Sequence, residues 1–123
     1  MKTNDNIFKN SPFGYALHKI VLDNTGKPVD YKFIEVNEAF EKLTGLKQSE
    51  IIGKNVTETI PGVETGEFDW IEFYGKVALE ETEENFEQYS EPLGKHYSVQ
   101  VYSPSKGIFC YNFHGYFRSE NHF

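Results

Sequence analysis

Hydrophobic and polar positions divide the chain into strand-like stretches near its two ends and helix-like stretches between them. Two stretches near the start predict a β-hairpin, because turn-forming residues at 23–28 separate them. Three later stretches, separated by turns at 92–95 and 104–107, predict an antiparallel meander. The predicted strands are residues 13–22, 29–36, 85–91, 96–103 and 108–116.

Several short helices are predicted after the first hairpin. Asn37 is a favourable N-cap and Gly45 a favourable end, so residues 38–44 predict one short helix. Residues 49–53 suggest a single turn. Asn55 and Glu58 have the spacing of a capping box and open another turn, which ends at Pro61-Gly62. Helices this short are not stable alone, so we expect tertiary packing to hold them.

One longer helix is predicted from the cap at Asp69 to about Thr82. Its hydrophobic residues recur at helical spacing and form a stripe that faces the core. They are Trp70, Ile71, Tyr74, Val77 and Ala78. With strands at both ends of the chain, the simplest closure is an α+β fold. It has one five-stranded antiparallel sheet, with the short helices and the longer helix packed on one face.

Composition fits a single globular domain with a core rich in aromatic rings. The chain of 123 residues is long enough for one core, and it contains eleven Phe, eight Tyr and one Trp. The net charge of −7 argues against nucleic acid as a partner, because phosphate binding needs clustered Lys and Arg, and Arg118 is the only arginine. The acidic run at 80–84 predicts a solvated helix end.

The cysteine content and the hydropathy of the chain indicate its cellular location. The single cysteine, Cys110, excludes an internal disulfide and favours a reducing compartment. The first six residues lead into no hydrophobic signal-peptide segment, and no apolar run approaches the ~20 residues of a membrane helix. We therefore expect a cytoplasmic protein with neither membrane nor nucleic acid as a partner.

No pattern of residues indicates catalysis or a metal site. None of the four histidines has a ligating partner at i+3 or i+4 on a helix, although His96 and His114 would be neighbours if the last two strands pair. A glycine-rich phosphate loop is missing, and no nucleophile has a recognisable context. Carboxylates such as Glu38 and Glu41 belong to solvated helix faces. The remaining histidines are His18 and His122. The sequence therefore predicts that the domain is not an enzyme.

Three blocks of sequence together resemble a known family. Residues 33–45 read Phe-Ile-Glu-Val-Asn-Glu-Ala-Phe-Glu-Lys-Leu-Thr-Gly, residues 50–54 read Glu-Ile-Ile-Gly-Lys, and residues 107–109 read Gly-Ile-Phe. In this order and spacing they resemble the PAS family over about residues 12–114. The part from Trp70 to Tyr102 resembles PAS sensors fused to histidine kinases and diguanylate cyclases. The resemblance implies a sensory domain at 11–117, between an N-terminal segment or cap at 1–10 and a tail at 118–123.

Departures from the family pattern limit the cofactor and the coupling to an output domain. The family's last strand commonly ends in Asp-(Ile/Val)-Thr, whereas residues 115–117 read Gly-Tyr-Phe. The chain is therefore expected to be either a piece of a longer protein or a stand-alone domain. The flavin-binding branch has a cysteine where this chain has Val56, and the haem-binding branch has a histidine in the long helix, which has none here. We expect neither haem nor flavin-adduct chemistry, and the cofactor stays open.

The resemblance also implies a small-molecule site between the sheet and the helices. In the last strand it places Phe109, Tyr111 and Phe113 toward the helices. In the strand before, it places alternate residues from Ser98 inward as polar groups that orient a ligand. Counting apolar residues alone favours the opposite face, with Val99 and Val101 in the core. The predicted ligand-binding residues are Phe40, Ile52, Val56, Trp70, Tyr74, Ser98, Gln100, Tyr102, Tyr111 and Phe113.

On the same assignment, the outer face of the sheet is apolar and predicts a homodimer, because such a surface is rarely left bare. The predicted dimer residues are Val99, Val101, Ile108 and Cys110. A ligand would then act by favouring one arrangement of sheet and dimer over another. The alternative is a PAS-type interaction or dimerisation module without a ligand, whose core is filled by its own aromatic side chains.

Overall fold

Five antiparallel strands form one sheet in the order β2-β1-β5-β4-β3. The computed structural model describes residues 13–66, 68–90 and 94–116. The first and last strands of the chain pair with each other in the middle of the sheet, where His18 lies opposite Phe109. The predicted sheet is therefore confirmed. Its strands are β1 (Gly14–Leu22), β2 (Pro28–Val36), β3 (Glu83–Ser90), β4 (Lys95–Ser105) and β5 (Ile108–Tyr116).

The first and the last of the helical segments between β2 and β3 have the caps that the sequence predicts. Gly45 ends the first helix in a left-handed conformation with φ of 82°, and its N–H donates to the Glu41 carbonyl. The Asp69 side chain accepts the Glu72 N–H at 3.0 Å and opens the longest helix. The segments are α2 (Glu38–Thr44), α3 (Gln48–Ile51), α4 (Val56–Thr59), the 3-10 helix η1 (Val63–Thr65) and α5 (Trp70–Glu80).

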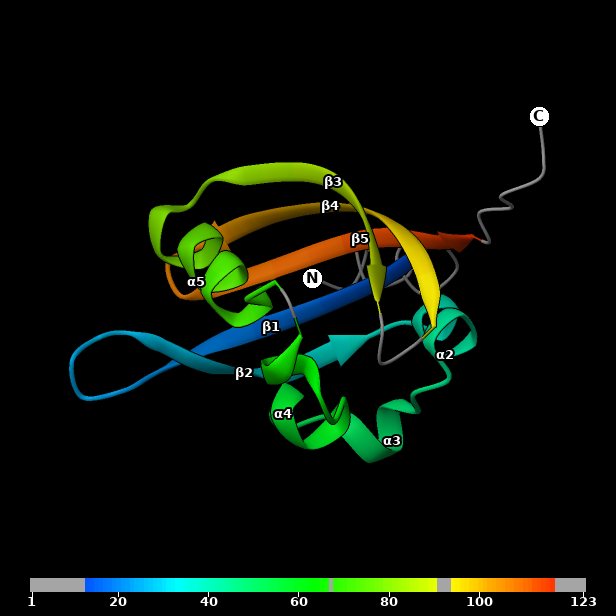
Figure 1. Cartoon of the computed structure of the whole chain (residues 1–123), viewed down its shortest axis with the longest axis horizontal. Helices are drawn as coiled ribbons and strands as arrows, with labels where there is room; N and C mark the ends of the chain where they lie inside the picture. The colour runs from blue at the N-terminus through cyan, green and yellow to red at the C-terminus, as the bar shows by residue number, and fades with distance from the viewer. Residues whose placement is uncertain (1–12, 67, 91–93, 117–123) are drawn as a thin grey trace.

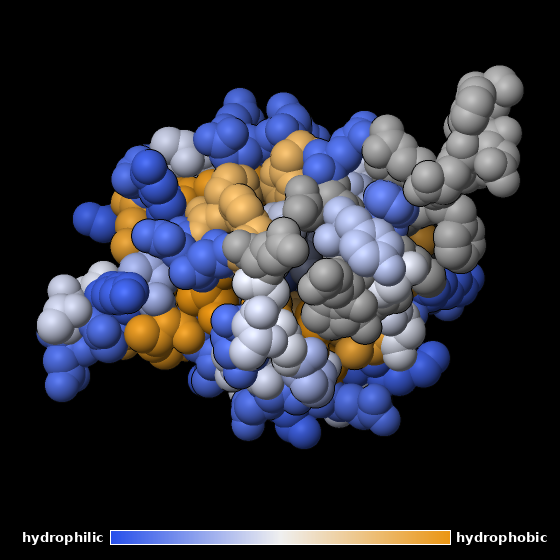
Figure 2. Space-filling model, in the orientation of Figure 1, coloured by the Kyte–Doolittle hydropathy of each residue, from blue (hydrophilic) through white to orange (hydrophobic). Residues whose placement is uncertain are grey.

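The described helices lie on one face of the sheet (Figure 1). Helix α5 packs against β1, β2, β4 and β5, whereas α2 packs on β1 and both α3 and α4 pack on β2. Gly75 allows α5 to approach β2 closely, because a Cβ atom there would lie 2.4 Å from Cγ of Pro28. Figure 2 shows this side of the molecule, with hydrophobic residues exposed among mostly hydrophilic ones.

Two buried polar side chains attach helices to strands. The Asn37 side-chain oxygen accepts the N–H groups of Phe40 and Tyr15 at 2.9 Å each, and its amide donates to the Phe13 carbonyl at 3.0 Å. The N-cap of α2 is therefore also a tie to β1. Asp30 on β2 accepts the Thr57 hydroxyl of α4 at 2.6 Å. Because both side chains are bonded, their burial carries little penalty.

The core between sheet and helices consists mainly of aromatic side chains. Phe33, Phe40 and Phe109 are fully buried, and Phe109 stacks on Tyr74 of α5 with ring centroids 4.8 Å apart. Phe113 contacts Phe40 of α2 edge-on at 5.8 Å. The placement of Phe109, Tyr111 and Phe113 toward the helices is confirmed.

The side chains of strand β4 point to the opposite faces of the sheet from those that the resemblance implied. Val99 pairs with Phe113 and Val101 pairs with Tyr111, and residues directly opposite in a ladder share a face. Val99 is 9% exposed and Val101 is 0% exposed, both within the core. The prediction that Ser98, Gln100 and Tyr102 face the helices is wrong, and counting apolar residues gives the right answer. Because successive side chains of a strand point to opposite faces, the placement of one pair fixes the placement of all the others.

Candidate functional site

A histidine lies at the centre of the aromatic core. His18 alternates along β1 with Ala16 and Ile20, which are also buried, so its side chain turns toward the helices. It is 0% exposed and stacks on Phe109 with ring centroids 4.3 Å apart and 16° between the planes. Its ring also contacts Phe33, Tyr31 and Tyr111 at 4.7 to 5.0 Å.

The contacts of His18 determine which nitrogen carries the proton. Nδ1 lies 3.3 Å from the carbonyl oxygen of Phe109, which can only accept, so Nδ1 is the N–H donor. Burial lowers the pKa of His18 to about 3, and the ring is therefore neutral at pH 7. In the neutral ring Nε2 is a bare acceptor. Nε2 is buried and has no hydrogen-bond partner among the described residues.

Two tyrosines contact this imidazole, Tyr31 and Tyr111, and a third, Tyr74, contacts both of them. Tyr31 comes from β2, Tyr74 from α5 and Tyr111 from β5, and each ring contacts at least one of the others at 5.7 Å. Burial raises the pKa of all three hydroxyl groups well above the usual value, and the proximity of the neighbouring hydroxyls raises it further. We call His18, Tyr31, Tyr74 and Tyr111 the polar centre of the core. All four side chains are neutral at pH 7.

A second group of rings lies where α5 begins. Trp70 is half-buried and contacts Phe68, Phe73 and Phe86, and it stacks on Tyr74 at 5.6 Å. Tyr74 therefore joins this group to the polar centre. Phe68 is 44% exposed, so the group reaches the surface.

The predicted ligand-binding residues divide into those inside the core and those outside it. Phe40, Val56, Tyr74, Tyr111 and Phe113 are buried between sheet and helices, and Trp70 lies at the border. Ile52 is 41% exposed, so its assignment to the core is wrong. Helix α3 ends at Ile51, which is buried instead, and the extended backbone of Ile52 turns its side chain outward. The roles of the buried residues toward a ligand stay predictions.

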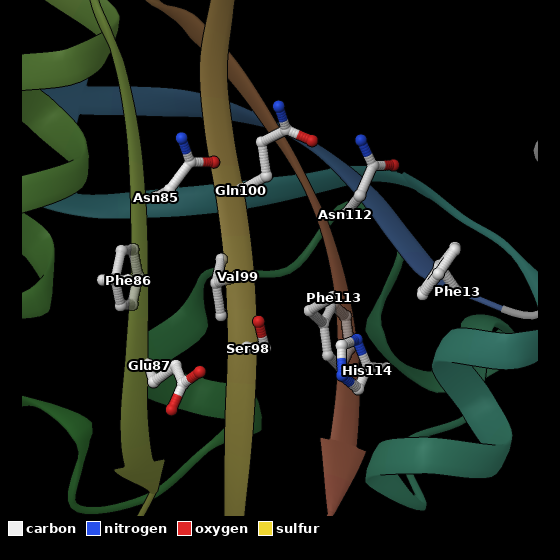
Figure 3. A pocket seen from close by; sticks show the side chains of 10 residues that line it. All are labelled: Phe13, Asn85, Phe86, Glu87, Ser98, Val99, Gln100, Asn112, Phe113 and His114. Atoms are coloured by element: carbon white, nitrogen blue, oxygen red, sulfur yellow. The ribbon is translucent and has the colours of Figure 1, made fainter.

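A groove of about 460 Å³ opens on the other face of the sheet and is lined by both polar and apolar side chains. Asn85, Gln100 and Asn112 lie opposite one another on three strands, and their amides point the same way (Figure 3). Gln100 belongs to this row, and Ser98 lies two positions along β4 on the same face, so both residues line this groove instead of the core. The lining residues are Phe13, Asn85, Phe86, Glu87, Ser98, Val99, Gln100, Asn112, Phe113 and His114.

Three of the four residues predicted to form the dimer face are buried in the described structure. Val99 and Val101 belong to the core, as shown above. Cys110 does turn to the other face, yet it is 2% exposed and offers no surface to a second copy. Ile108 is half-buried. The assignment of Val99, Val101 and Cys110 to a dimer interface is therefore wrong, because the facing of β4 was reversed and the thiol is covered.

Neither the cysteine nor the histidines form a reactive or metal-binding group in the described part of the chain. Burial raises the pKa of Cys110, and its thiol interacts with the Tyr102 hydroxyl. His96 lies opposite Tyr116 and His114 opposite Ser98, so the two histidines are diagonal neighbours. The described residues hold no group of three His, Cys, Asp or Glu side chains that could bind a metal ion.

Sequence reasoning missed His18. The available signal was its position in phase with Ala16 and Ile20 on a strand that lies in the middle of the sheet. A single histidine in a strand carries no motif, so only the pairing of β1 with β5 reveals its burial.

The family model described as a PAS domain matches residues 5–79, which is more than half of the chain. The chain therefore belongs to the PAS domain family, whose members are generally input modules of signalling proteins. No curated protein matches the chain.

Solved structures support the same fold. A LOV protein from Rhodobacter sphaeroides aligns with a TM-score of 0.61 at 14% identity, covering 98% of this chain and 69% of that one. A blue-light activated histidine kinase from Erythrobacter litoralis aligns with a TM-score of 0.58 at 22% identity over 98% of this chain and 38% of the kinase. A domain of a sensory box sensor histidine kinase/response regulator from Geobacter sulfurreducens aligns with a TM-score of 0.59 at 14% identity, covering 92% and 91%.

Among the helices that the structure describes, none has the length and hydrophobicity needed to span a bilayer. At these identities the solved structures establish the fold and leave the ligand open.

Proposed function

We propose that the chain is a signal-transduction input domain that binds a small molecule between the sheet and the helices and relays binding through its contacts with a partner. The polar centre carries this proposal. An aromatic core that holds a few convergent polar groups is the usual composition of a small-molecule site. His18 Nε2 is a buried acceptor without a partner, which costs free energy unless another molecule supplies a donor.

The residues proposed to contact the ligand are the buried members of the predicted set. Tyr74 and Tyr111 belong to the polar centre, and Phe40, Val56 and Phe113 line the same core. Trp70 borders it from the end of α5 that reaches the surface. Haem and flavin-adduct chemistry are not part of the proposal, because Val56 and the residues of α5 lack the side chains that those cofactors need.

The proposed relay runs along β5. The Tyr111 ring contacts the Phe113 ring at 5.3 Å, and Phe113 lies opposite Gly14 at the start of β1. A Cβ atom at Gly14 would lie 2.7 Å from the Phe113 ring, so the contact is close. A ligand that shifts Tyr111 would therefore act on the place where the first and last strands meet. A second copy of the chain or a kinase or cyclase output domain is the proposed receiver.

A second candidate function is an interaction module without a ligand. Close ring packing supports it, since His18, Phe109 and Tyr74 form a continuous stack with centroid distances of 4.3 and 4.8 Å. In that case the aromatic side chains fill the core themselves. Either function is proposed as non-catalytic and cytoplasmic, which agrees with the single cysteine and the lack of a catalytic motif.

Native mass spectrometry of the protein purified without refolding distinguishes the two functions. The input-domain proposal expects a mass above that of the chain, which denaturation removes. Trp70→Ala should weaken retention of the small molecule, because it opens the border of the core. Tyr89→Ala removes an exposed ring of β3 outside this group and serves as the control. A mass equal to that of the bare chain, together with no binding from a metabolite library, would support the module without a ligand.

A further inference from the structure

The groove on the face of the sheet opposite the helices contains three side-chain amides in one row. Asn85 on β3 lies opposite Gln100 on β4, which lies opposite Asn112 on β5, and their amides point the same way (Figure 3). Asn85 and Gln100 are exposed, and Asn112 is half-buried. Within the described part of the chain, no hydrogen bond engages these side-chain amides. Their N–H donors and carbonyl acceptors can therefore bind another molecule.

Strand formation does not explain this choice of residues. Asn is depleted in strands, because its side chain competes for backbone hydrogen bonds, yet two of the three amides belong to Asn. Threonine would suit the same positions of a solvated strand better. The row of amides is therefore better explained by recognition of a ligand than by folding.

A second polar row lies beside the amides in the same groove. Glu87, Ser98 and His114 lie opposite one another on the same three strands, which together span about 10 Å. Phe13 lines the groove next to His114, with ring centroids 5.5 Å apart. Its ring is 49% exposed, so it can contact a ligand at this end. The groove therefore offers hydrogen-bonding groups in two rows and one apolar ring at its edge.

The charge of the groove excludes anionic ligands. The described lining residues include one carboxylate, Glu87, and neither Lys nor Arg. A phosphate or carboxylate group would therefore meet no cation, and Glu87 and the net charge of −7 would repel it.

The distribution of polar groups restricts the ligand further. A nucleobase is polar along its edge and apolar on its faces, whereas the two rows present hydrogen-bonding groups across the groove. A neutral molecule with hydroxyl groups spread over its surface matches this pattern, because each amide can both donate to a hydroxyl oxygen and accept from a hydroxyl proton.

We propose that this groove is a second binding site, which takes a neutral carbohydrate about two sugar rings long. The volume of about 460 Å³ lies within the range of small-molecule sites. The amides of Asn85, Gln100 and Asn112 bind the hydroxyl groups, and the Phe13 ring contacts the C–H face of one sugar. The site lies on the opposite face of the sheet from the core, so this inference goes beyond the proposed input function and does not depend on it.

Cellobiose, a neutral disaccharide, tests the proposal on the whole chain. Titration followed by proton–nitrogen NMR should shift the side-chain amide signals of Asn85, Gln100 and Asn112. Gln100→Ala removes the central, exposed amide and should weaken binding about tenfold, as expected for the loss of one or two hydrogen bonds. Gln48→Ala removes an exposed amide of α3, away from the groove, and is the matched control, which should bind as the wild-type protein does.

Three further probes test the ligand class. Methyl glucoside has one ring and should bind more weakly than cellobiose. Methyl glucuronide adds a carboxylate to that ring and should bind more weakly than methyl glucoside. Adenosine presents a flat base and should bind more weakly than cellobiose. Equal or tighter binding of the glucuronide or of adenosine in these comparisons would overturn the proposed class.

Other outcomes would overturn the site itself. Amide signals that cellobiose leaves unshifted would do so, as would a Gln100→Ala protein that binds cellobiose like the wild-type protein. Amide signals that move with protein concentration alone would assign the groove to a second copy of the chain. Each of these results leaves the proposed input function of the core untouched, because the core lies on the other side of the sheet.

Discussion

At the scale of single residues, His18 links the stability of the domain to pH. Its pKa in the folded chain is about 3 because of burial, against an ordinary value of 6.5, so the unfolded chain binds a proton that the folded chain refuses. Stability therefore falls as pH drops below about 6.5. The titratable groups around the ring are Tyr31, Tyr74 and Tyr111, whose raised pKa values keep them neutral throughout this range.

We expect urea unfolding of the unliganded protein to show a loss of about 2 kcal/mol between pH 7 and pH 5 from His18. His18→Phe removes the group that titrates, so its stability should change less over the same range by about that amount. His114→Phe, which removes an exposed histidine instead of the buried one, is the control substitution. Equal pH dependence in the wild-type protein and His18→Phe would show that the imidazole is not buried in neutral form.

The structural role of a residue could be predicted where the local sequence determines that role. The cap at Asn37 and the end at Gly45 follow from chemistry within one turn, and both were predicted correctly. The burial of His18 depends on the pairing of β1 with β5, which joins residues 91 positions apart. Ile51 and Ile52 are equally hydrophobic neighbours, so only the end of α3 decides which of them enters the core.

At the scale of elements, the contact of α5 with β2 depends on Gly75. A Cβ atom there would lie 2.4 and 2.6 Å from two atoms of the Pro28 ring, which is held by the backbone and cannot turn away. Gly75→Ala should therefore destabilise the domain by about 1 to 3 kcal/mol, although alanine favours helices more than glycine does.

Gly66→Ala is the matched control for this prediction. A Cβ atom at Gly66 meets nothing within 4 Å, and φ of −73° suits any residue. Its urea midpoint should match that of the wild-type protein or exceed it. A Gly75→Ala protein as stable as Gly66→Ala would mean that α5 can move away from β2 without cost.

The residue that ends helix α5 has a left-handed backbone conformation. It is a glutamate, although glycine tolerates this conformation best. Glu81 has φ of 55°, and its N–H donates to the Val77 carbonyl. Because a side chain in this conformation costs free energy that glycine avoids, Glu81→Gly should stabilise the domain by about 1 kcal/mol. Glu80→Gly, one residue earlier and still helical, should destabilise it by about 0.5 to 1 kcal/mol. Thermal unfolding compares the two; a loss of stability in both would contradict the assigned end of α5.

The facing of β4 shows why elements are predicted more easily than their orientation. Its existence and its hairpin with β5 follow from alternation and from the turn around Gly107. From sequence, either face of β4 could be the one that turns toward the core, because Ser98 and Gln100 alternate with Val99 and Val101. Hydrophobic burial decided the outcome. The valines are buried opposite Tyr111 and Phe113, whereas Gln100 lies between Asn85 and Asn112 and Ser98 between Glu87 and His114. Apolar pattern was the better guide here than family resemblance.

At the scale of the whole molecule, the sheet order gives the two edge strands different environments. The outer edge of β2 is bonded at Phe33, whose N–H donates to the Lys54 carbonyl at 3.0 Å and whose carbonyl accepts the Gly53 N–H at 2.8 Å. Among described residues, β3 pairs with β4 alone and carries no strand on its other edge. An exposed edge of this kind is where further strands can pair.

Hydrogen exchange should reveal this asymmetry. Amides of β5, which pairs with β1 and β4, should exchange most slowly, and the Phe33 amide should be protected although β2 is an edge strand. Amides of β3 that point away from β4 should exchange fastest among the strands. Measurement at two protein concentrations serves as the control for association. If the outer β3 amides exchange as slowly as those of β5 only at the higher concentration, a second copy covers this edge. Slow exchange at both concentrations would contradict the prediction that the edge of β3 is open within one chain.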